Sequence, residues 1–237
     1  MTDAIRRYGI SACFPAFNEA ENLEALVAAA DQVLRTVTEN YELIIVDDGS
    51  TDRTKEVVKC LAPRYPQLQV IHHAQNHGYG AALVTGFKNC QKDLVFFSDA
   101  DNQFDLHDLP KLLALIDRAD VVVGYRAKRG DPSHRRLNAL LWNALIRLLL
   151  KVKVRDLNCA FKLFRRSILE EIGLDQLTST GAMINAELLA KLGKVHARIR
   201  EVEVPHYPRR YGRQTGASPG VILKAFKELF KLYSQLR

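Results

Sequence analysis

Short apolar runs alternate with longer amphipathic stretches along the first half of the chain. The short runs predict strands, and those at residues 41–46 and 93–98 are so continuously apolar that both faces of each strand should be buried. The amphipathic stretches predict helices. In order, the predicted strands cover residues 9–14, 41–46, 69–72, 93–98 and 120–124, and the predicted helices cover residues 19–37, 52–61, 80–90 and 107–118, with Asn18 as the first N-cap. This alternation predicts an α/β fold with a mostly parallel sheet flanked by helices.

The second half of the chain is less regular. Its predicted helices cover residues 137–150, 182–192 and 221–236, and its predicted strands cover residues 159–164 and 195–204. The second of these strands alternates apolar and polar residues, which predicts that one of its faces is exposed. Residues 207–218 are basic and contain glycine, which is typical of a loop. We expect one domain over residues 1–237, ending in an amphipathic helix.

Composition narrows the classes of protein without selecting one. The 237 residues are 47% hydrophobic and 26% charged, as in an ordinary globular protein. The four cysteines are scattered without CxxC spacing, so we expect reduced thiols in the cytoplasm. No signal peptide opens the chain and no apolar window reaches the length of a spanning helix. The formal charge of +7 favours an acidic partner: nucleic acid, an anionic membrane surface or a phosphorylated substrate.

The candidate chemistry lies just after the predicted strands, where open α/β sheets bind their ligands. Residues 15–19 follow the first strand, Asp47 and Asp48 the second, residues 99–103 the fourth, and Arg126 the fifth. Three of these four strand ends carry carboxylates. Such a density of acids at one edge is costly unless a cation compensates for it.

A divalent cation is the economical compensation for these acids. Asp99 and Asp101 lie two residues apart, so both can face one ion from an extended turn, and Gln103 offers a further oxygen. Mg²⁺ and Mn²⁺ prefer oxygen ligands and leave places for phosphate oxygens. The alternative is that these aspartates only cap the next helix. The strand context and the acid pair at the second strand favour metal binding.

The glycines are wrongly placed for two other nucleotide-binding classes. A dinucleotide-binding dehydrogenase needs GxGxxG after its first strand, and here that turn is acidic and contains no glycine. Residues 77–80 (HGYG) follow the third strand and are too short for a P-loop. They indicate a close approach of the backbone at the start of a helix, where a diphosphate could lie.

Several motifs together resemble family 2 glycosyltransferases of the GT-A type, and within them the polyprenyl-phosphate (dolichyl-phosphate) mannosyl- and glucosyltransferases. The segments that carry the resemblance are PAFNEAENL, IIVDDGSTDRT, NHGYGAALVTGF and FSDADNQF, followed by the looser VGYRAKRG, DLNCAFKLFRRSIL, GAMINAELL and YPRRYGRQTGAS. They extend over residues 10–223. The resemblance implies a Rossmann-like GT-A fold in which residues 9–130 bind the nucleotide sugar and residues 131–237 bind the acceptor.

Carried over residue by residue, the resemblance implies a donor site. Pro15, Phe17 and Glu19 would line the pocket for the base, while Asp47 and Asp48 would hold the base and ribose. The same resemblance assigns Mg²⁺ or Mn²⁺, bridging the diphosphate, to a group of three residues. These ligands are Asp99, Asp101 and Gln103, with Asp99 also counted among the nucleotide-binding residues and Asp101 among the catalytic ones.

The resemblance also implies an acceptor site and a closing loop. Arg126 and Arg136 would face the acceptor phosphate, with Arg135 as a substitute, and Arg126 is also counted among the catalytic residues. Glu187 would lie near the reacting sugar as a further catalytic residue. The residues expected to close over the diphosphate are Arg210 and Arg213. The sequence alone leaves two alternatives open: that Arg135 and Arg136 form a solvated face, and that Glu187 is an ordinary exposed helix residue.

The expected reaction is an inverting transfer of a hexose from a nucleoside diphosphate sugar, of the GDP-mannose or UDP-glucose type, to a polyprenyl phosphate. A lipid phosphate is already an anion near pH 7, so it needs positioning by arginines and no strong base. A saccharide hydroxyl, as in cell-surface polysaccharide synthesis, would need a carboxylate base. The arginines between residues 126 and 136 favour the phosphate.

Two stretches suggest contact with a membrane surface. Residues 137–150 are apolar but interrupted by Arg147, and residues 221–237 place apolar side chains on one face with lysines around it. A basic amphipathic helix can lie among lipid headgroups. Alternatively, this stripe packs on the core or on a protein partner. We expect peripheral attachment at the cytoplasmic face of the membrane, directly or through a membrane-protein partner, and no nucleic-acid partner.

Two other classes compete with the glycosyltransferase. A sugar-nucleotide pyrophosphorylase also combines metal with an α/β sheet, but it would need a glycine-rich signature near the N-terminus that this chain lacks. A nucleotide-binding protein without catalysis would not need both acidic motifs. Turnover is what separates this last class from an enzyme.

Overall fold

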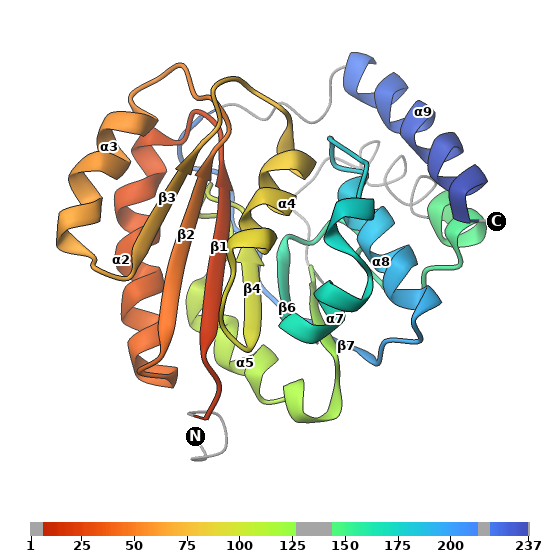
Figure 1. Cartoon of the computed structure of the whole chain (residues 1–237), viewed down its shortest axis with the longest axis horizontal. Coiled ribbons are helices and arrows are strands. Elements are labelled where there is room, and N and C mark those ends of the chain that lie inside the picture. Colours follow the sequence, from red (N-terminus) through yellow and green to blue (C-terminus); the bar gives the residue numbers. More distant parts are fainter. Residues whose placement is uncertain (1–6, 127–143, 213–218, 237) are drawn as a thin grey trace.

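A single seven-stranded sheet organises the molecule (Figure 1). The computed structural model describes residues 7–126, 144–212 and 219–236, and in the last segment the side chains of residues 226–234. The strand order is β3-β2-β1-β4-β6-β5-β7, and every neighbouring pair is parallel except those that include β6. The strands are β1 (Ile10–Ala16), β2 (Tyr41–Asp47), β3 (Leu68–His72), β4 (Leu94–Ser98), β5 (Val121–Tyr125), β6 (Phe161–Arg165) and β7 (Ile199–Glu203).

Burial along the strands follows their place in the sheet. All residues of β1 and β4 are buried, as their continuous apolar runs predict for strands covered on both faces. The edge strands β3 and β7 instead mix exposed and half-buried residues. β6 comes from the second half of the chain and inserts between β4 and β5, so the sheet extends through both halves of the sequence.

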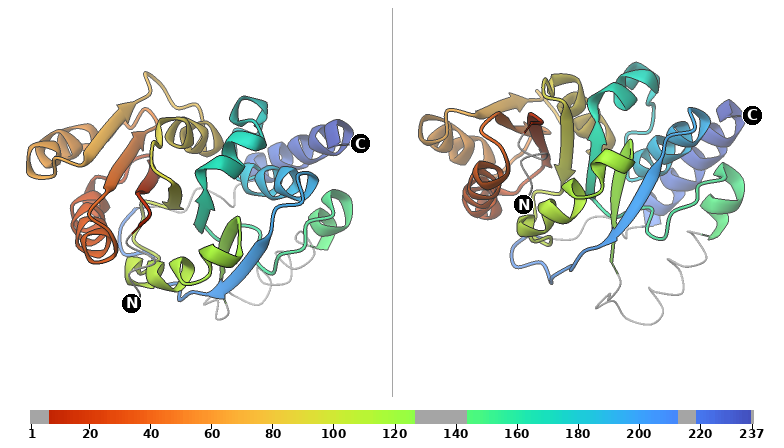
Figure 2. Two further views of the ribbon diagram at one scale, coloured as in Figure 1. Left: turned by 60° about the horizontal axis from the view of Figure 1, so that its bottom comes forward. Right: turned by 90° about the horizontal axis from the view of Figure 1, so that it is seen from below.

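Helices cover both faces of the sheet. The connections from β1 to β2 and from β3 to β4 run in opposite directions across the sheet, so right-handed crossovers place α2 and α4 on opposite faces, as Figure 2 shows. The α-helices are α2 (Ala20–Val37), α3 (Thr54–Leu61), α4 (Tyr79–Asn89), α5 (Leu109–Leu113), α7 (Arg166–Glu171), α8 (Ile184–Lys194) and α9 (Pro219–Leu236), and residues 144–150 are also helical.

Aromatic rings pack on both faces of the neighbouring strands β4 and β6. Phe96 and Phe161 meet edge to face with ring centroids 4.8 Å apart, and Phe97 stacks on Phe164 at 6.1 Å. Phe87 of α4 contacts both rings of the stacked pair. Because β4 and β6 are locked together in this way, the residues that follow β4 start from a fixed position.

The structure confirms the expected α/β architecture and corrects several details. The single helix expected over residues 107–118 is broken into a 3₁₀ turn (Leu106–Asp108), the short α5 and a second 3₁₀ turn (Ile116–Arg118). The strand expected over residues 195–204 is reduced to β7, because His196 adopts a left-handed backbone conformation with φ of 54° that ends α8 in a turn. The N-cap expected at Asn18 is also wrong: Glu19 occupies that position, without a capping side chain.

The C-terminal helix is present and packs on the protein. In α9, Leu229 and Leu232 are buried in the core, whereas Phe230 is 64% exposed and lies between the exposed Lys227 and Lys231. Part of the apolar stripe is therefore covered by the chain itself. Among the helices of the described segments, none has the length and apolar composition required to cross a bilayer.

Candidate active site

The carboxyl ends of the parallel strands gather the predicted site residues at one edge of the sheet, the upper edge in Figure 1. The register of β1 on β2 pairs Ala16 with Asp47, so these two strands end at the same level. β4 lies on the other side of β1 and delivers Asp99, and β5 delivers Arg126. The topology thus brings together residues that are more than 100 positions apart in the sequence.

Two asparagines in left-handed conformations connect the turns of this edge. Asn18 has φ of 57°, and its Oδ1 accepts hydrogen bonds from the backbone N–H of Thr51 at 2.8 Å and of Asp52 at 3.2 Å. Asn102 has φ of 56° and donates to the carbonyl of Asn22 at 2.8 Å. Asparagine tolerates this conformation better than most residues. Asn18 therefore joins the turns after β1 and β2 instead of capping a helix.

The acid pair after β4 has one carboxylate oxygen without a hydrogen bond. Oδ1 of Asp99 is buried without a hydrogen bond, although the residue as a whole keeps some exposure. Burial is the main cause that raises the pKa of Asp99 to about 7, and the charge of Asp101 is the second cause. Part of this rise is offset by Tyr79, Lys162 and Arg126. A buried carboxylate oxygen without a donor is the environment that a bound cation would relieve.

Arg209 supplies positive charge to this acid pair, and the sequence analysis missed it. Its guanidinium forms an ion pair with Glu19 and lies 3.5 Å from Oδ2 of Asp101. All three side chains are at most 16% exposed. The two arginines predicted on this loop were Arg210, which is exposed, and Arg213, which lies outside the described residues. The sequence PRRYG does not distinguish the two adjacent arginines, because the turn of the folded chain determines which of them faces inward.

Gln103 connects the acid pair to the segment that carries Arg209. Its backbone N–H donates to Oδ1 of Asp101 at 3.1 Å, and its side-chain amide donates to the carbonyl of Tyr207 at 2.9 Å. The N–H of Tyr207 in turn donates to the carbonyl of Gln103 at 2.8 Å. The predicted ligand Gln103 therefore lies beside the acid pair, with its amide nitrogen used to hold residues 207–212 across the site.

The aspartates after β2 are engaged within the chain. Asp47 accepts from the N–H of Ser50 and pairs with His72; although burial disfavours its charge, these contacts lower its pKa. Asp48 pairs with His73 at 2.6 Å and accepts from the N–H of Gly78 at 2.8 Å. Both carboxylates therefore organise the turn of β2 and the loop that follows β3.

Two glycines permit close packing of these loops. Gly49 has φ of 69°, and a Cβ there would come within 2.4 Å of the Gln75 carbonyl carbon. A Cβ on Gly80 would come within 2.2 Å of the Ser179 carbonyl oxygen. The close backbone approach predicted for residues 77–80 is therefore confirmed, and the segment approached is the one that precedes α8.

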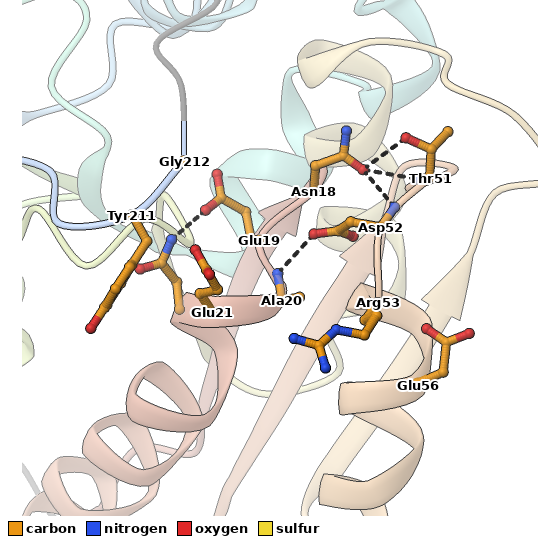
Figure 3. Close-up of a pocket in the computed structure, with 11 residues that line it drawn as sticks. Asn18, Glu19, Ala20, Glu21, Thr51, Asp52, Arg53, Glu56, Tyr211 and Gly212 are labelled. Carbon is orange, nitrogen blue, oxygen red and sulfur yellow. Dashed lines mark hydrogen bonds between the residues drawn. The ribbon is translucent and has the colours of Figure 1, made fainter.

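A pocket of 530 Å³ opens beside the turn of β1 (Figure 3). Its walls are residues 18–22, residues 51–53 with Glu56, and Tyr211 with Gly212. Of the residues predicted for the base pocket, Glu19 lines it, Pro15 is buried in β1, and Phe17 lies 39% exposed at the strand end. Burial raises the pKa of Glu19, and contacts with Asn22 and Arg209 limit this rise.

Arg126 is held by a carboxylate 30 positions further along the chain, that of Asp156. Asp156 accepts from Nε of Arg126 at 2.7 Å and from its Nη2 at 3.0 Å, a bidentate pair that fixes the plane of the guanidinium. Asp156 is 3% exposed. Arg135 and Arg136, the other predicted acceptor-phosphate residues, lie outside the described part of the chain.

Glu187 is buried and bound to backbone. It is 0% exposed, so it is not the exposed helix residue that the sequence allowed. Its carboxylate accepts from the N–H of Thr178 at 3.0 Å and of Ser179 at 2.8 Å. The carbonyl of Thr180 then accepts from the N–H of Gly80. Glu187 thus positions the segment that packs against the glycine turn.

A fully buried lysine lies beneath the site and was also missed from the sequence. Lys162 of β6 is 0% exposed, and its ammonium donates to the carbonyl of Cys159 and to Oδ1 of Asn185 at 2.8 Å. Burial lowers its pKa to about 8, although Cys159, Asp156 and Asp99 act in the opposite direction. The charge of Lys162 therefore offsets part of the negative potential of the acid pair.

The donor set fits a divalent ion that also needs ligands from a substrate. Within the described segments, no group of three or more His, Cys, Asp or Glu side chains is arranged to hold a metal. Asp99 and Asp101 supply two carboxylates, and one of their oxygens has no partner. Mg²⁺ is commonly held by one or two carboxylates together with phosphate oxygens. The residues present therefore fit such an ion.

Comparison with known sequences gives a family match. The sequence model of Glycosyl transferase family 2 matches residues 11–173. An undecaprenyl-phosphate 4-deoxy-4-formamido-L-arabinose transferase from Serratia proteamaculans (strain 568) is 32% identical over 206 residues, covering 86% of this chain and 61% of that protein. The chain spans about three fifths of the length of the curated relatives it matches.

Comparison with solved structures agrees on the fold. Glucosyl-3-phosphoglycerate synthase from Mycobacterium tuberculosis, in complex with Mg²⁺ and uridine diphosphate, superposes with a TM-score of 0.72 at 20% identity, covering 96% of this chain and 80% of that one. Its complex with Mn²⁺, uridine diphosphate and glucosyl-3-phosphoglycerate gives a TM-score of 0.66 at 21% identity, with coverages of 97% and 77%. At these identities the likeness shows the fold alone, and it bears out the expected GT-A class.

Proposed function

The chain belongs to glycosyl transferase family 2, and from this we propose that it transfers a sugar from a nucleoside diphosphate to a polyprenyl phosphate, with inversion and with Mg²⁺ or Mn²⁺ as cofactor. The choice of a phosphate as acceptor rests on the hydrogen-bond partners of Glu187 and Arg126. The carboxylate expected near the sugar is bound to backbone N–H groups, while an arginine is held in fixed orientation at the end of β5.

The acceptor needs little proton chemistry in this proposal. A hydroxyl acceptor requires a base within hydrogen-bonding reach. Glu187 is enclosed and already accepts from Thr178 and Ser179, so it is poorly placed for that task. A phosphate carries its own negative charge and needs only positioning, which Arg126 offers through its bidentate anchor on Asp156.

The proposed donor site consists of Asp99, Asp101 and the turn that follows β1. Asp99 and Asp101 would hold the metal, with Gln103 beside them, and a bound divalent ion would neutralise the charge that develops on the leaving diphosphate. Phe17 offers a partly exposed ring on which a base can stack. The residues proposed to shape this pocket are Pro15, Glu19, Asp47 and Asp48.

The resemblance to mannosyl- and glucosyltransferases implies a hexose as the transferred sugar. Two of the matching relatives are instead named for a modified arabinose. The structural neighbours bind uridine diphosphate. A panel of donors should therefore include GDP-mannose, UDP-glucose and a nucleoside diphosphate carrying the formamido-arabinose.

We further propose that the enzyme works at the cytoplasmic surface of a membrane, where a polyprenyl phosphate would be met. The formal charge of +7 favours an anionic leaflet, at roughly 1 kcal/mol for each basic residue near the surface. In α9, the exposed Phe230 with Lys227 and Lys231 gives a small basic and aromatic face.

The test is transfer of radiolabelled sugar from each donor to undecaprenyl phosphate in detergent, with free saccharides as competing acceptors. We expect labelled lipid, dependence on Mg²⁺ or Mn²⁺, and loss of product in Asp101→Asn. Product found only on saccharide hydroxyls would replace the proposal with polysaccharide synthesis. Nucleotide binding without turnover on any acceptor would point to a binding protein.

A further inference from the structure

Arg209 occupies the position of a cation in the donor site, beside the carboxylates proposed for the metal. It makes an ion pair with Glu19 and approaches Asp101 to 3.5 Å, and its side chain is 16% exposed. Neither Glu19 nor Asp101 is more than 12% exposed. Two nearly buried carboxylates side by side repel each other unless positive charge lies between them.

The chain around Arg209 is shaped to keep the guanidinium at this position. Nε of Arg209 donates to the carbonyl of Tyr211 at 2.6 Å, which folds the side chain back over its own loop. Gly212 has φ of 83°, and a Cβ there would lie 2.7 Å from Nη2 of Arg209. The absence of a side chain at Gly212 therefore leaves room for the guanidinium.

The base of the same segment is fixed to the turn that carries the acid pair. The backbone N–H of Tyr207 donates to the carbonyl of Gln103, and the side-chain amide of Gln103 donates to the Tyr207 carbonyl. The ring of His206 packs on Phe104 with centroids 5.0 Å apart. Arg209 therefore starts two residues from an anchored point. Its reach to Asp101 is set by the fold and does not depend on a long flexible loop.

Arg209 compensates only one of the two aspartates. Its guanidinium forms ion pairs with Glu19 and Asp101, whereas Oδ1 of Asp99 accepts no hydrogen bond. A divalent ion between Asp99 and Asp101 would serve both, and it would compete with the guanidinium for Asp101. One arginine and one metal cannot both take the same carboxylate oxygen at close range.

From this geometry we infer that Arg209 is a positioning residue that holds the place of the metal in the metal-free enzyme, so that the ion must displace its guanidinium from Asp101 in order to bind. The inference rests on the proposed use of a divalent ion by this site. Its consequence is weak metal binding in the absence of nucleotide, because the ion first has to break an existing pair.

The test measures Mn²⁺ affinity by electron paramagnetic resonance in the full chain without nucleotide. Arg209→Gln should bind Mn²⁺ at least fivefold more tightly than the parent, and Arg209→Lys should lie between them, because an ammonium cannot reach both carboxylates as a guanidinium does. Arg210→Gln is the matched control: it removes the same charge from the neighbouring exposed position and should leave this affinity within twofold of the parent.

The outcomes separate this inference from the proposed function. If Arg209→Gln binds Mn²⁺ no more tightly than the parent, or if Arg210→Gln tightens binding as much, Arg209 is not a placeholder, although the metal site stands. If neither the parent nor any variant binds Mn²⁺, even with uridine diphosphate or guanosine diphosphate added, both ideas fail. Circular dichroism establishes that each variant is folded, and Arg209→Lys provides the measurement if Arg209→Gln is not.

Discussion

Replacing Asp99 by asparagine should remove the proposed metal site and at the same time stabilise the metal-free protein. Asp99 has a pKa of about 7 in place of its usual 3.8, and burial is the main cause, followed by the charge of Asp101. Each tenfold change in a proton equilibrium is worth about 1.4 kcal/mol, so the ionised carboxylate costs the folded state at most about 4 kcal/mol at pH 8. The asparagine amide has the same shape and no charge, so it avoids that cost. Its oxygen would still be buried without a hydrogen-bond donor, which limits the gain in stability.

The net gain should be about 1–2 kcal/mol, which for a chain of this size raises Tm by roughly 3–6 °C. The sign follows from proton linkage. Because the folded pKa lies above the unfolded one, the folded protein binds more protons between about pH 4 and pH 7, and its stability falls as the pH rises through that window. The advantage of Asp99→Asn should therefore be largest at pH 8 and small at pH 5.

Differential scanning calorimetry with EDTA present measures both effects, and metal-dependent transfer is assayed in parallel. Asp120→Asn is the control: the Asp120 carboxylate accepts from the backbone and guanidinium of Arg198, which lowers its pKa, so its loss should reduce Tm at pH 8. A lower or unchanged Tm for Asp99→Asn at pH 8, or an equal shift at pH 5, would refute the reasoning.

Three further substitutions test other parts of the site. Phe17→Ala should weaken nucleoside diphosphate binding about tenfold in calorimetry, since base stacking on an aromatic ring is worth about 1–3 kcal/mol, and an unchanged Kd would place the base elsewhere. Asp156→Asn removes the charged anchor of Arg126 and should raise KM for the lipid phosphate at least fivefold with little change in donor KM; equal effects on both would indicate a general loss of structure. Gly80→Ala places a Cβ 2.2 Å from the Ser179 carbonyl and should cost about 2 kcal/mol or more, measured as a lower Tm; an unchanged Tm would mean that this segment is loosely packed.

The order of elements followed from the sequence because periodicity is a local property. Strands buried on both faces, such as β2 and β4, show as uninterrupted apolar runs, and the helices between them show a period near 3.6. The breaks were harder to foresee. The helix expected over residues 107–118 is instead two 3₁₀ turns around α5, and Pro110, which has no backbone N–H to continue the preceding turn, lies at the start of α5.

The residues at the carboxyl ends of the strands could be identified from the sequence. Asp47, Asp99 and Arg126 follow apolar runs directly, and the parallel order of the strands then requires that they share one edge. That requirement depends only on the alternation of strands and helices. The acid-rich edge, and with it the expectation of a cation, therefore follows from the sequence.

The partners that balance each charge at this edge are brought together by the tertiary structure. Arg209 faces Glu19 across 190 positions, Asp156 anchors Arg126 across 30, and Lys162 is buried beneath the acid pair on a strand inserted from the second half of the chain. Hydrogen bonds and ion pairs depend on separations of about 3 Å and on orientation. Neither is encoded in local periodicity, so an inward arginine and an outward one, such as Arg209 and Arg210, look the same until the chain is folded.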